Sequence, residues 1–140
     1  MQLSKNFSLS EFTYSETAKK LGINNNAPSN IVEKLRILCI ECLQPIRDKY
    51  GKSITISSGY RCEKLNNAIG GSKTSQHCLG EAADIIAGDK KINKILFDLI
   101  INSGVPFDQL IWEKGDKNGP DWVHISYKAN PNRRQILYLS

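Results

Sequence analysis

Apolar residues recur at three- and four-residue steps in two long stretches of the chain, which predicts two amphipathic helices. The first helix begins at Pro28-Ser29, ends at Gly51, and directs inward Ile31, Leu35, Leu38, Cys42 and Ile46. Pro45 predicts a kink or a restart late in this helix, because proline has no backbone N–H to donate. The second helix covers residues 90–104, and its predicted inward positions are Ile92, Ile95, Leu96, Leu99 and Ile100.

Five shorter stretches alternate apolar and polar residues or are rich in β-branched residues, which predicts strands. They are residues 53–57, 82–87, 107–113, 122–127 and 133–139, with shorter helical segments within 7–26 and at 63–69. A helix followed by strands that are joined largely by hairpins and one helical crossover predicts an α+β fold with a small antiparallel sheet flanked by helices. The chain has no internal repeat or linker, so we expect one domain over residues 1–140.

Composition narrows the class of protein. With 40% hydrophobic and 24% charged residues, the chain fits a soluble globular protein. The net charge of +5 is scattered, and Arg133-Arg134 is the one compact basic pair, so we expect no nucleic-acid partner. No apolar run reaches the roughly 18 residues of a membrane span, and the first residues do not resemble a signal peptide. We therefore expect no membrane insertion, synthesis in the cytoplasm, and a monomer.

The four cysteines divide into two pairs. Cys39 and Cys42 have the spacing of a zinc knuckle or a redox motif, but they lie inside the apolar pattern of the first helix. No second pair of metal ligands follows with matching spacing, so buried thiols are the better interpretation. Cys62 and Cys78 are far apart in the sequence, and a disulfide between them stays open.

The chain has only two histidines, and each lies near a carboxylate. His77 lies in the stretch S-Q-H-C-L-G-E-A-A-D, which ends at Asp84, and His124 lies in D-W-V-H-I-S. Catalytic zinc takes three protein ligands and keeps one position for water. Gly80 permits a tight turn that brings the His77 loop back beside the strand of Asp84. We predict that His77, Asp84 and His124 bind one zinc ion.

Two further residues have candidate catalytic roles beside this zinc. Asp121 is the candidate general base, which takes a proton from water and passes it to the leaving amine. On an ideal strand Asp121 and His124 point to opposite faces, so this role requires Asp121 to remain in the turn after Gly119-Pro120. Arg61, in S-S-G-Y-R, is predicted to bind a substrate carboxylate or to stabilise the oxyanion of the tetrahedral intermediate.

Three other residues are candidates for contact with substrate. Trp122 shares a strand face with His124 and is predicted to form a wall of the site. Ser75 either donates a hydrogen bond to substrate or caps the loop that carries His77. Gln109 either orients a metal ligand or binds backbone at a strand edge.

These stretches resemble the zinc D-Ala-D-Ala carboxypeptidase family of metallopeptidases. The spacing S-x-H-x-x-G-x-A-x-D from Ser75 to Asp84 is similar to its signature, D-W-V-H to its acid-x-x-His, and S-S-G-Y-R to its arginine motif. The resemblance runs from about residue 7 to the end, and is closest to the small single-domain subgroup common in phage and prophage. It implies a hedgehog/DD-peptidase-like fold, zinc on the three predicted ligands, Asp121 as base and Arg61 on the substrate. Many members have Glu where this chain has Asp121.

The resemblance also implies a substrate, the peptide stem of bacterial peptidoglycan. Members include D-Ala-D-Ala carboxypeptidases and L-alanyl-D-glutamate endopeptidases, and the motifs leave this choice open. We expect a role in cell-wall lysis by a phage or prophage, either after release through a membrane lesion or as part of the virion. The alternative function is a non-catalytic zinc-containing module that binds cell wall or belongs to the virion structure.

Overall fold

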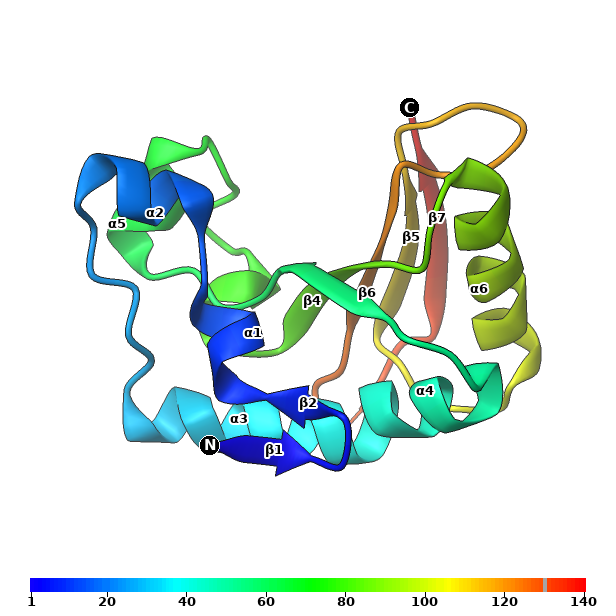
Figure 1. Cartoon of the computed structure of the whole chain (residues 1–140), viewed down its shortest axis with the longest axis horizontal. Helices are drawn as coiled ribbons and strands as arrows, with labels where there is room; N and C mark the ends of the chain where they lie inside the picture. The colour runs from blue at the N-terminus through cyan, green and yellow to red at the C-terminus, as the bar shows by residue number, and fades with distance from the viewer. Residues whose placement is uncertain (130) are drawn as a thin grey trace.

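The computed structural model describes residues 1–129 and 131–140, which form a two-stranded sheet, a five-stranded sheet and surrounding helices (Figure 1). The elements in chain order are β1 (Gln2–Ser4), β2 (Phe7–Ser8), α1 (Leu9–Thr13), α2 (Glu16–Leu21), α3 (Ser29–Leu38), the π-helix η1 (Cys39–Leu43), α4 (Gln44–Tyr50), β3 (Thr55–Ser58), α5 (Glu63–Ala68), the 3₁₀ helix η2 (Gln76–Leu79), β4 (Ala82–Ile86), α6 (Lys90–Asn102), β5 (Gln109–Glu113), β6 (Trp122–Ser126) and β7 (Gln135–Leu139). None of the described helices combines the length and the apolar character that a membrane span requires.

The larger sheet has the strand order β3-β4-β6-β5-β7. Its first four strands pair antiparallel, as the alternating patterns predict, and the α+β fold class is confirmed. The last strand, β7, pairs parallel with β5, so the sheet is mixed at this edge. After β6 the chain returns to the end of the sheet where β5 begins, and the backbone N–H of Gln135 donates to the carbonyl of Asp108.

The first predicted helix is confirmed, and Pro45 acts as predicted. All five predicted inward residues of this helix are buried. The helix passes from α3 to α4 through the π-helical turn η1, in which the N–H of Gln44 donates to the carbonyl of Cys39, five residues earlier. A proline cannot donate in the usual i to i−4 pattern, and one wider turn before Pro45 lets the helix continue without that bond.

The inward face predicted for α6 is partly wrong. Ile92 and Ile95 are exposed, while Asn93, Leu96, Phe97 and Ile100 are buried. The apolar pattern was ambiguous because isoleucines occupy both sides of this helix. Asn93 takes the inward position because its side chain has backbone partners there: it accepts from the N–H groups of Ala87 and Gly88 and donates to the carbonyls of Pro120 and Asp121.

The two faces of the five-stranded sheet have different roles. Leu110, Val123 and Ile125 point into the core, and α6 packs on this side, as Figure 1 shows at the right of the sheet. Strand residues alternate between faces, so Asp84, Trp122 and His124 lie on the opposite face. The residues predicted to bind metal and substrate therefore share the face that the core does not use.

Candidate active site

Three side chains predicted to bind zinc come together in the structure. His77 comes from η2, Asp84 from β4 and His124 from β6, and one ligand atom from each lies within 4.8 Å of the others. His77 Nε2 is 3.4 Å and His124 Nδ1 is 3.0 Å from the same oxygen of Asp84, Oδ1. The three side chains are largely buried.

Local structure explains how this group forms. In the antiparallel register of β4 and β6, Asp84 lies directly opposite His124, so both side chains project from the same face. The hydroxyl of Ser75 accepts from the backbone N–H of His77 and caps η2. Gly80 ends η2 with a positive φ of 73°, a conformation that favours glycine, and the chain then enters β4. The tight turn predicted at Gly80 is therefore confirmed.

The arrangement fits a zinc ion. Nδ1 of His77 lies 2.7 Å from the carbonyl oxygen of Gly59, which places the ring proton on Nδ1 and leaves the lone pair of Nε2 toward Asp84. A lone pair and a carboxylate oxygen that face each other repel, unless a proton or a metal ion lies between them, and a metal ion can contact all three side chains at once. Ligands about 2.1 Å from a tetrahedral zinc lie roughly 3.4 Å apart, which is close to the two distances to Asp84 Oδ1.

The charge state of Asp84 suits a metal ligand. Burial alone raises the pKa of its carboxyl, but the contacts with His124 and His77 outweigh burial and hold the pKa well below its ordinary value. Asp84 is therefore ionised at neutral pH. Two neutral imidazoles and one carboxylate would leave a zinc ion with one positive charge and one position for a further ligand.

Arg61 lies beside the candidate metal ligands, a position that is compatible with its predicted role on the substrate. Its Nη2 is 3.5 Å from Asp84 Oδ2, the oxygen that does not face the histidines. Nε donates to Ser58 Oγ at 3.2 Å, and Nη1 approaches Asn66 Oδ1 at 3.5 Å. The guanidinium is mostly buried and also lines a hollow of about 300 Å³ with Tyr14, Tyr60 and Leu65. Arg61 can therefore orient Asp84 and contact a bound substrate.

Sequence reasoning missed the asparagines that hold the Arg61 segment. Buried Asn25 donates to the carbonyls of Thr13 and Tyr60 and accepts from the N–H of Cys62, so its amide fixes the chain on both sides of Arg61. Asn66, also buried, accepts from Arg61 and donates to the carbonyl of Ser72. Both residues lie in polar stretches that carry no periodic signal, and only the folded contacts distinguish them from turn residues.

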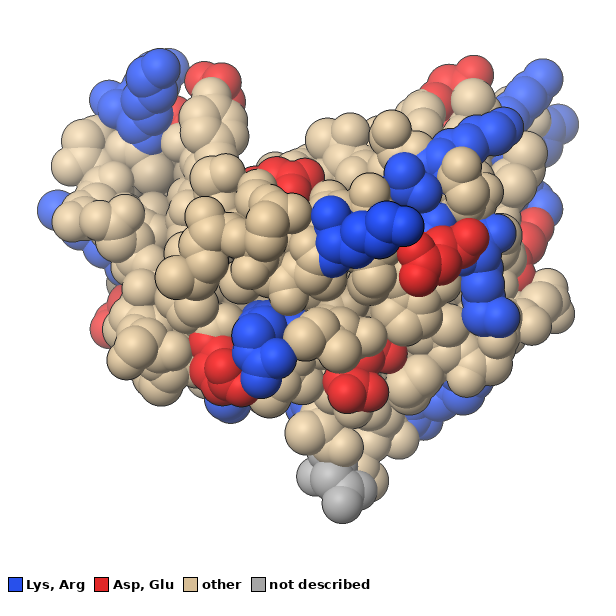
Figure 2. Space-filling view, turned by 60° about the horizontal axis from the view of Figure 1, so that its bottom comes forward, with Lys and Arg blue, Asp and Glu red and all other residues tan. Residues whose placement is uncertain are grey.

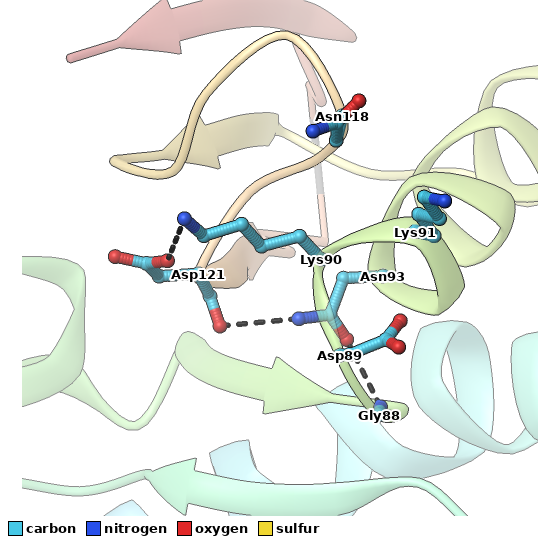
Figure 3. Close-up of a pocket in the computed structure, with 7 residues that line it drawn as sticks. All are labelled: Gly88, Asp89, Lys90, Lys91, Asn93, Asn118 and Asp121. Carbon is cyan, nitrogen blue, oxygen red and sulfur yellow. Dashed lines mark hydrogen bonds and ion pairs between the residues drawn. The ribbon is translucent and has the colours of Figure 1, made fainter.

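Asp121 remains in the turn before β6, the position that its predicted role requires. Its carboxylate is 46% exposed and lies 3.9 Å from Lys90 Nζ, and Lys90 also pairs with Asp116 at 3.2 Å. Figure 3 shows the Asp121 and Lys90 side chains extending in the same direction, beside a pocket of about 560 Å³. The three predicted zinc ligands do not line this pocket, and the side-chain contact of Asp121 in the described residues is with Lys90. Its role as base therefore stays a prediction.

The other three candidates have clear positions. Ser75 caps η2, and because its oxygen accepts there, its own O–H remains able to donate to substrate. Trp122 is partly buried on the face of His124, and its Nε1 has no hydrogen-bond partner among the described residues. Gln109 donates to Gln135 at 2.7 Å across the β5–β7 pair and does not bind a metal ligand in the described residues. Contact of these side chains with substrate stays a prediction.

A buried carboxylate that sequence reasoning did not consider links the His77 segment to the end of the chain. Asp108 is fully buried and accepts from Arg133 through N, Nε and Nη2 at 2.7 to 3.0 Å. It also accepts from Gln76 Nε2 at 3.1 Å, next to His77 in the chain. The stretch F-D-Q-L predicted a strand, and an acidic residue at its start was indistinguishable from an exposed one.

The cysteines do not contribute to the metal group. Cys39 and Cys42 are fully buried in the core, as predicted, and burial raises the pKa of the Cys39 thiol to about 12. A thiol with so high a pKa stays protonated and binds metal poorly. Cys62 and Cys78 are free thiols in the structure, and both are partly buried.

The surface charge is scattered on the face that Figure 2 shows. Lys and Arg side chains there alternate with Asp and Glu instead of forming one basic surface. Ion pairs in the described residues also engage several charged side chains, including Lys34 with Glu81 and Arg36 with Glu33. This distribution offers no basic track for a nucleic-acid backbone on that face.

Two histidines and one aspartate are a ligand set that hydrolytic zinc enzymes use, and they would hold zinc with one position left for water. The sequence profile of the peptidase M15 family matches residues 5–126, which is most of the chain, so the protein belongs to this zinc D-Ala-D-Ala carboxypeptidase-type family of metallopeptidases. None of the curated proteins compared with the chain matches it. The family predicted from the two histidine motifs is therefore confirmed.

Proposed function

We propose that the protein hydrolyses peptide stems of bacterial peptidoglycan, as a D-Ala-D-Ala carboxypeptidase or an L-Ala-D-Glu endopeptidase. The main support for this proposal is that the side chains of His77, Asp84 and His124 lie close together, with Arg61 beside Asp84. Peptide stems contain free carboxylates, and a guanidinium next to the metal ligands suits such a substrate. A phage or prophage lysis enzyme, acting on the wall after release or from the virion, is the biological role most consistent with this substrate.

Each residue of the proposed site has a separate role in hydrolysis. Zinc bound to the three ligands would bring the pKa of a coordinated water near 7 and polarise the peptide carbonyl. Arg61 holds a substrate carboxylate or the developing oxyanion. Asp121, in the turn before β6, accepts a proton from the attacking water and returns it to the leaving amine. Ser75 and Trp122 contact the substrate around the scissile bond.

The test is mass spectrometry of purified peptidoglycan fragments incubated with the zinc-loaded protein, with and without a chelator. Chelator-sensitive loss of terminal D-alanine identifies a carboxypeptidase, and cleavage between L-Ala and D-Glu identifies an endopeptidase. Asp84→Asn should abolish either product, whereas Asp98→Asn, an exposed change on α6, should not. Fragments from several wall types that stay intact, although the protein binds zinc, would overturn the proposal and favour a non-catalytic wall-binding module.

A further inference from the structure

Glu113, the last residue of β5, faces the metal site. In the antiparallel register of β5 and β6, Ile111 lies opposite His124 and Glu113 lies opposite Trp122. Side chains two residues apart on a strand share a face, so Glu113 projects from the same face as His124 and beside the Trp122 side chain. Consistent with this position, the negative charge of Asp84 adds to burial in raising the pKa of the Glu113 carboxyl.

The Glu113 carboxylate has no cationic partner among the residues that the structure describes. It is half-buried, and burial first, then the negative charge of Asp84, raise its pKa. The nearby lysines are engaged elsewhere: Lys114 donates to the carbonyl of Ser140, and Lys90 pairs with Asp116 and Asp121. A partly buried carboxylate without a partner is costly, and a cation from a bound ligand would offset that cost.

Arg61 and Glu113 lie on opposite sides of the metal ligands. The strand order is β3-β4-β6-β5, with Asp84 on β4 and His124 on β6. Arg61 follows β3 and contacts Asp84 from one side, whereas Glu113 lies on β5, beyond His124. A peptide bound across the ligands would therefore meet a positive charge at one end and a negative charge at the other.

We propose that Glu113 is a specificity residue that binds a primary ammonium group of the peptide substrate, with the Trp122 ring beside it. A carboxylate and an indole together favour an ammonium, through a charge-assisted hydrogen bond and a cation–π contact. The substrate then lies with its carboxylate toward Arg61 and its amino group toward Glu113. This inference rests on the proposed function and specifies the substrate class as peptides that carry a free amine on that side of the scissile bond.

The test compares two synthetic stem peptides that are identical except that their amino groups are free in one and acetylated in the other. Binding to the zinc-free protein is measured by tryptophan fluorescence, and kcat/KM is measured with zinc. We expect the unchanged protein to favour the free amine about tenfold in both measurements, as for a hydrogen bond to a charged group. Glu113→Gln, which keeps the size of the side chain, should reduce this ratio to about one. It should leave the values for the acetylated peptide unchanged.

Asp98→Asn is the matched control, because it removes one negative charge from an exposed position on α6 and should keep the tenfold ratio. Equal binding of the two peptides by the unchanged protein, or a ratio that survives Glu113→Gln, overturns the inference. The two proposals fail separately. Chelator-sensitive cleavage without an amine preference supports the proposed function and overturns the role of Glu113. A preference for the free amine in binding, without cleavage, supports the role of Glu113 and overturns the proposed function.

Discussion

His77 Nδ1 lies 2.7 Å from the backbone carbonyl oxygen of Gly59, and this contact decides which nitrogen of the ring can bind zinc. The carbonyl can only accept, so Nδ1 carries the proton and Nε2 is free for the metal. Gly59 is itself held by its neighbours, since the N–H of Tyr60, the next residue, donates to the carbonyl of Phe12 at 2.7 Å. The α1 segment therefore helps to orient His77 through Gly59 and Tyr60.

Gly59→Ala should weaken zinc binding. A Cβ at residue 59 would lie 2.6 Å from the Cα and the carbonyl oxygen of Phe12, which are backbone atoms, so the Gly59 carbonyl must shift. Loss of such a partner of a ligand histidine typically lowers metal affinity about 10- to 100-fold. Titration against a competing chelator measures the zinc affinity.

Gly104→Ala is the control for this experiment. Gly104 has a positive φ of 75° and open space around it, so alanine there lowers the free energy of unfolding through backbone strain alone. Zinc affinity should be unchanged in Gly104→Ala. Equal losses of affinity in the two variants would show that general destabilisation, not the orientation of His77, explains the effect.

Arg61→Ala should lower zinc affinity as well as activity. Arg61 Nη2 contacts Asp84 Oδ2 and so fixes the carboxylate whose other oxygen faces the histidines. We expect zinc affinity to fall about tenfold and kcat/KM to fall further, because substrate contact is also lost. Arg61→Lys should restore little, since an ammonium cannot contact Ser58, Asn66 and Asp84 together.

Calorimetric zinc titration and steady-state kinetics on the same protein samples separate the two roles of Arg61. The control is Arg36→Ala, which removes an arginine from an exposed ion pair with Glu33. If Arg61→Ala binds zinc normally and loses only activity, Arg61 acts on the substrate alone.

The proximity of the three candidate metal ligands was predictable because chemistry and spacing agreed. The chain has only two histidines, each near a carboxylate, and a glycine precedes the strand that carries Asp84. These features allow few ways to bring the three side chains together, and in the structure the register of β4 and β6 places Asp84 opposite His124. The parallel addition of β7 was not predictable, because nothing in residues 133–139 distinguishes parallel from antiparallel pairing. Buried polar residues such as Asn25 and Asp108 were missed because their partners come from distant segments, and periodicity detects only apolar faces.

Asp121→Asn should abolish turnover and leave zinc bound. Asparagine has nearly the same size but cannot accept a proton, so kcat should fall about 10²- to 10⁴-fold if Asp121 is the base. Asp116→Asn is a close control, because Asp116 pairs with the same lysine, Lys90, at 3.2 Å. Its kcat should stay within about twofold of the unchanged protein, as expected for an exposed pair. Loss of turnover in both variants would show that the loss arises from disturbed contacts with Lys90 in this turn, and not from removal of a general base.

The ionised carboxylate of Asp108 should stabilise the fold at neutral pH, and this stabilisation should be lost in acid. Hydrogen bonds from Arg133 are the main cause that lowers the pKa of the Asp108 carboxyl from 3.8 to about 2. A carboxyl with a lowered pKa in the folded state stabilises the fold above its ordinary pKa, and this contribution is lost as the pH falls from about 4 toward 2. The shift corresponds to about 2 kcal/mol.

Urea unfolding of the unchanged protein and Asp108→Asn, from pH 7 to pH 3, measures this contribution. At pH 7 the variant should be about 2 kcal/mol less stable, and the difference should begin to shrink below about pH 4, where protonation of Asp108 in the unfolded state becomes favourable. Asp98→Asn, which alters an exposed pair with Lys94, should change stability by less than about 0.5 kcal/mol at any pH. A difference for Asp108→Asn that stays constant with pH would show that its loss of stability arises from packing instead of charge.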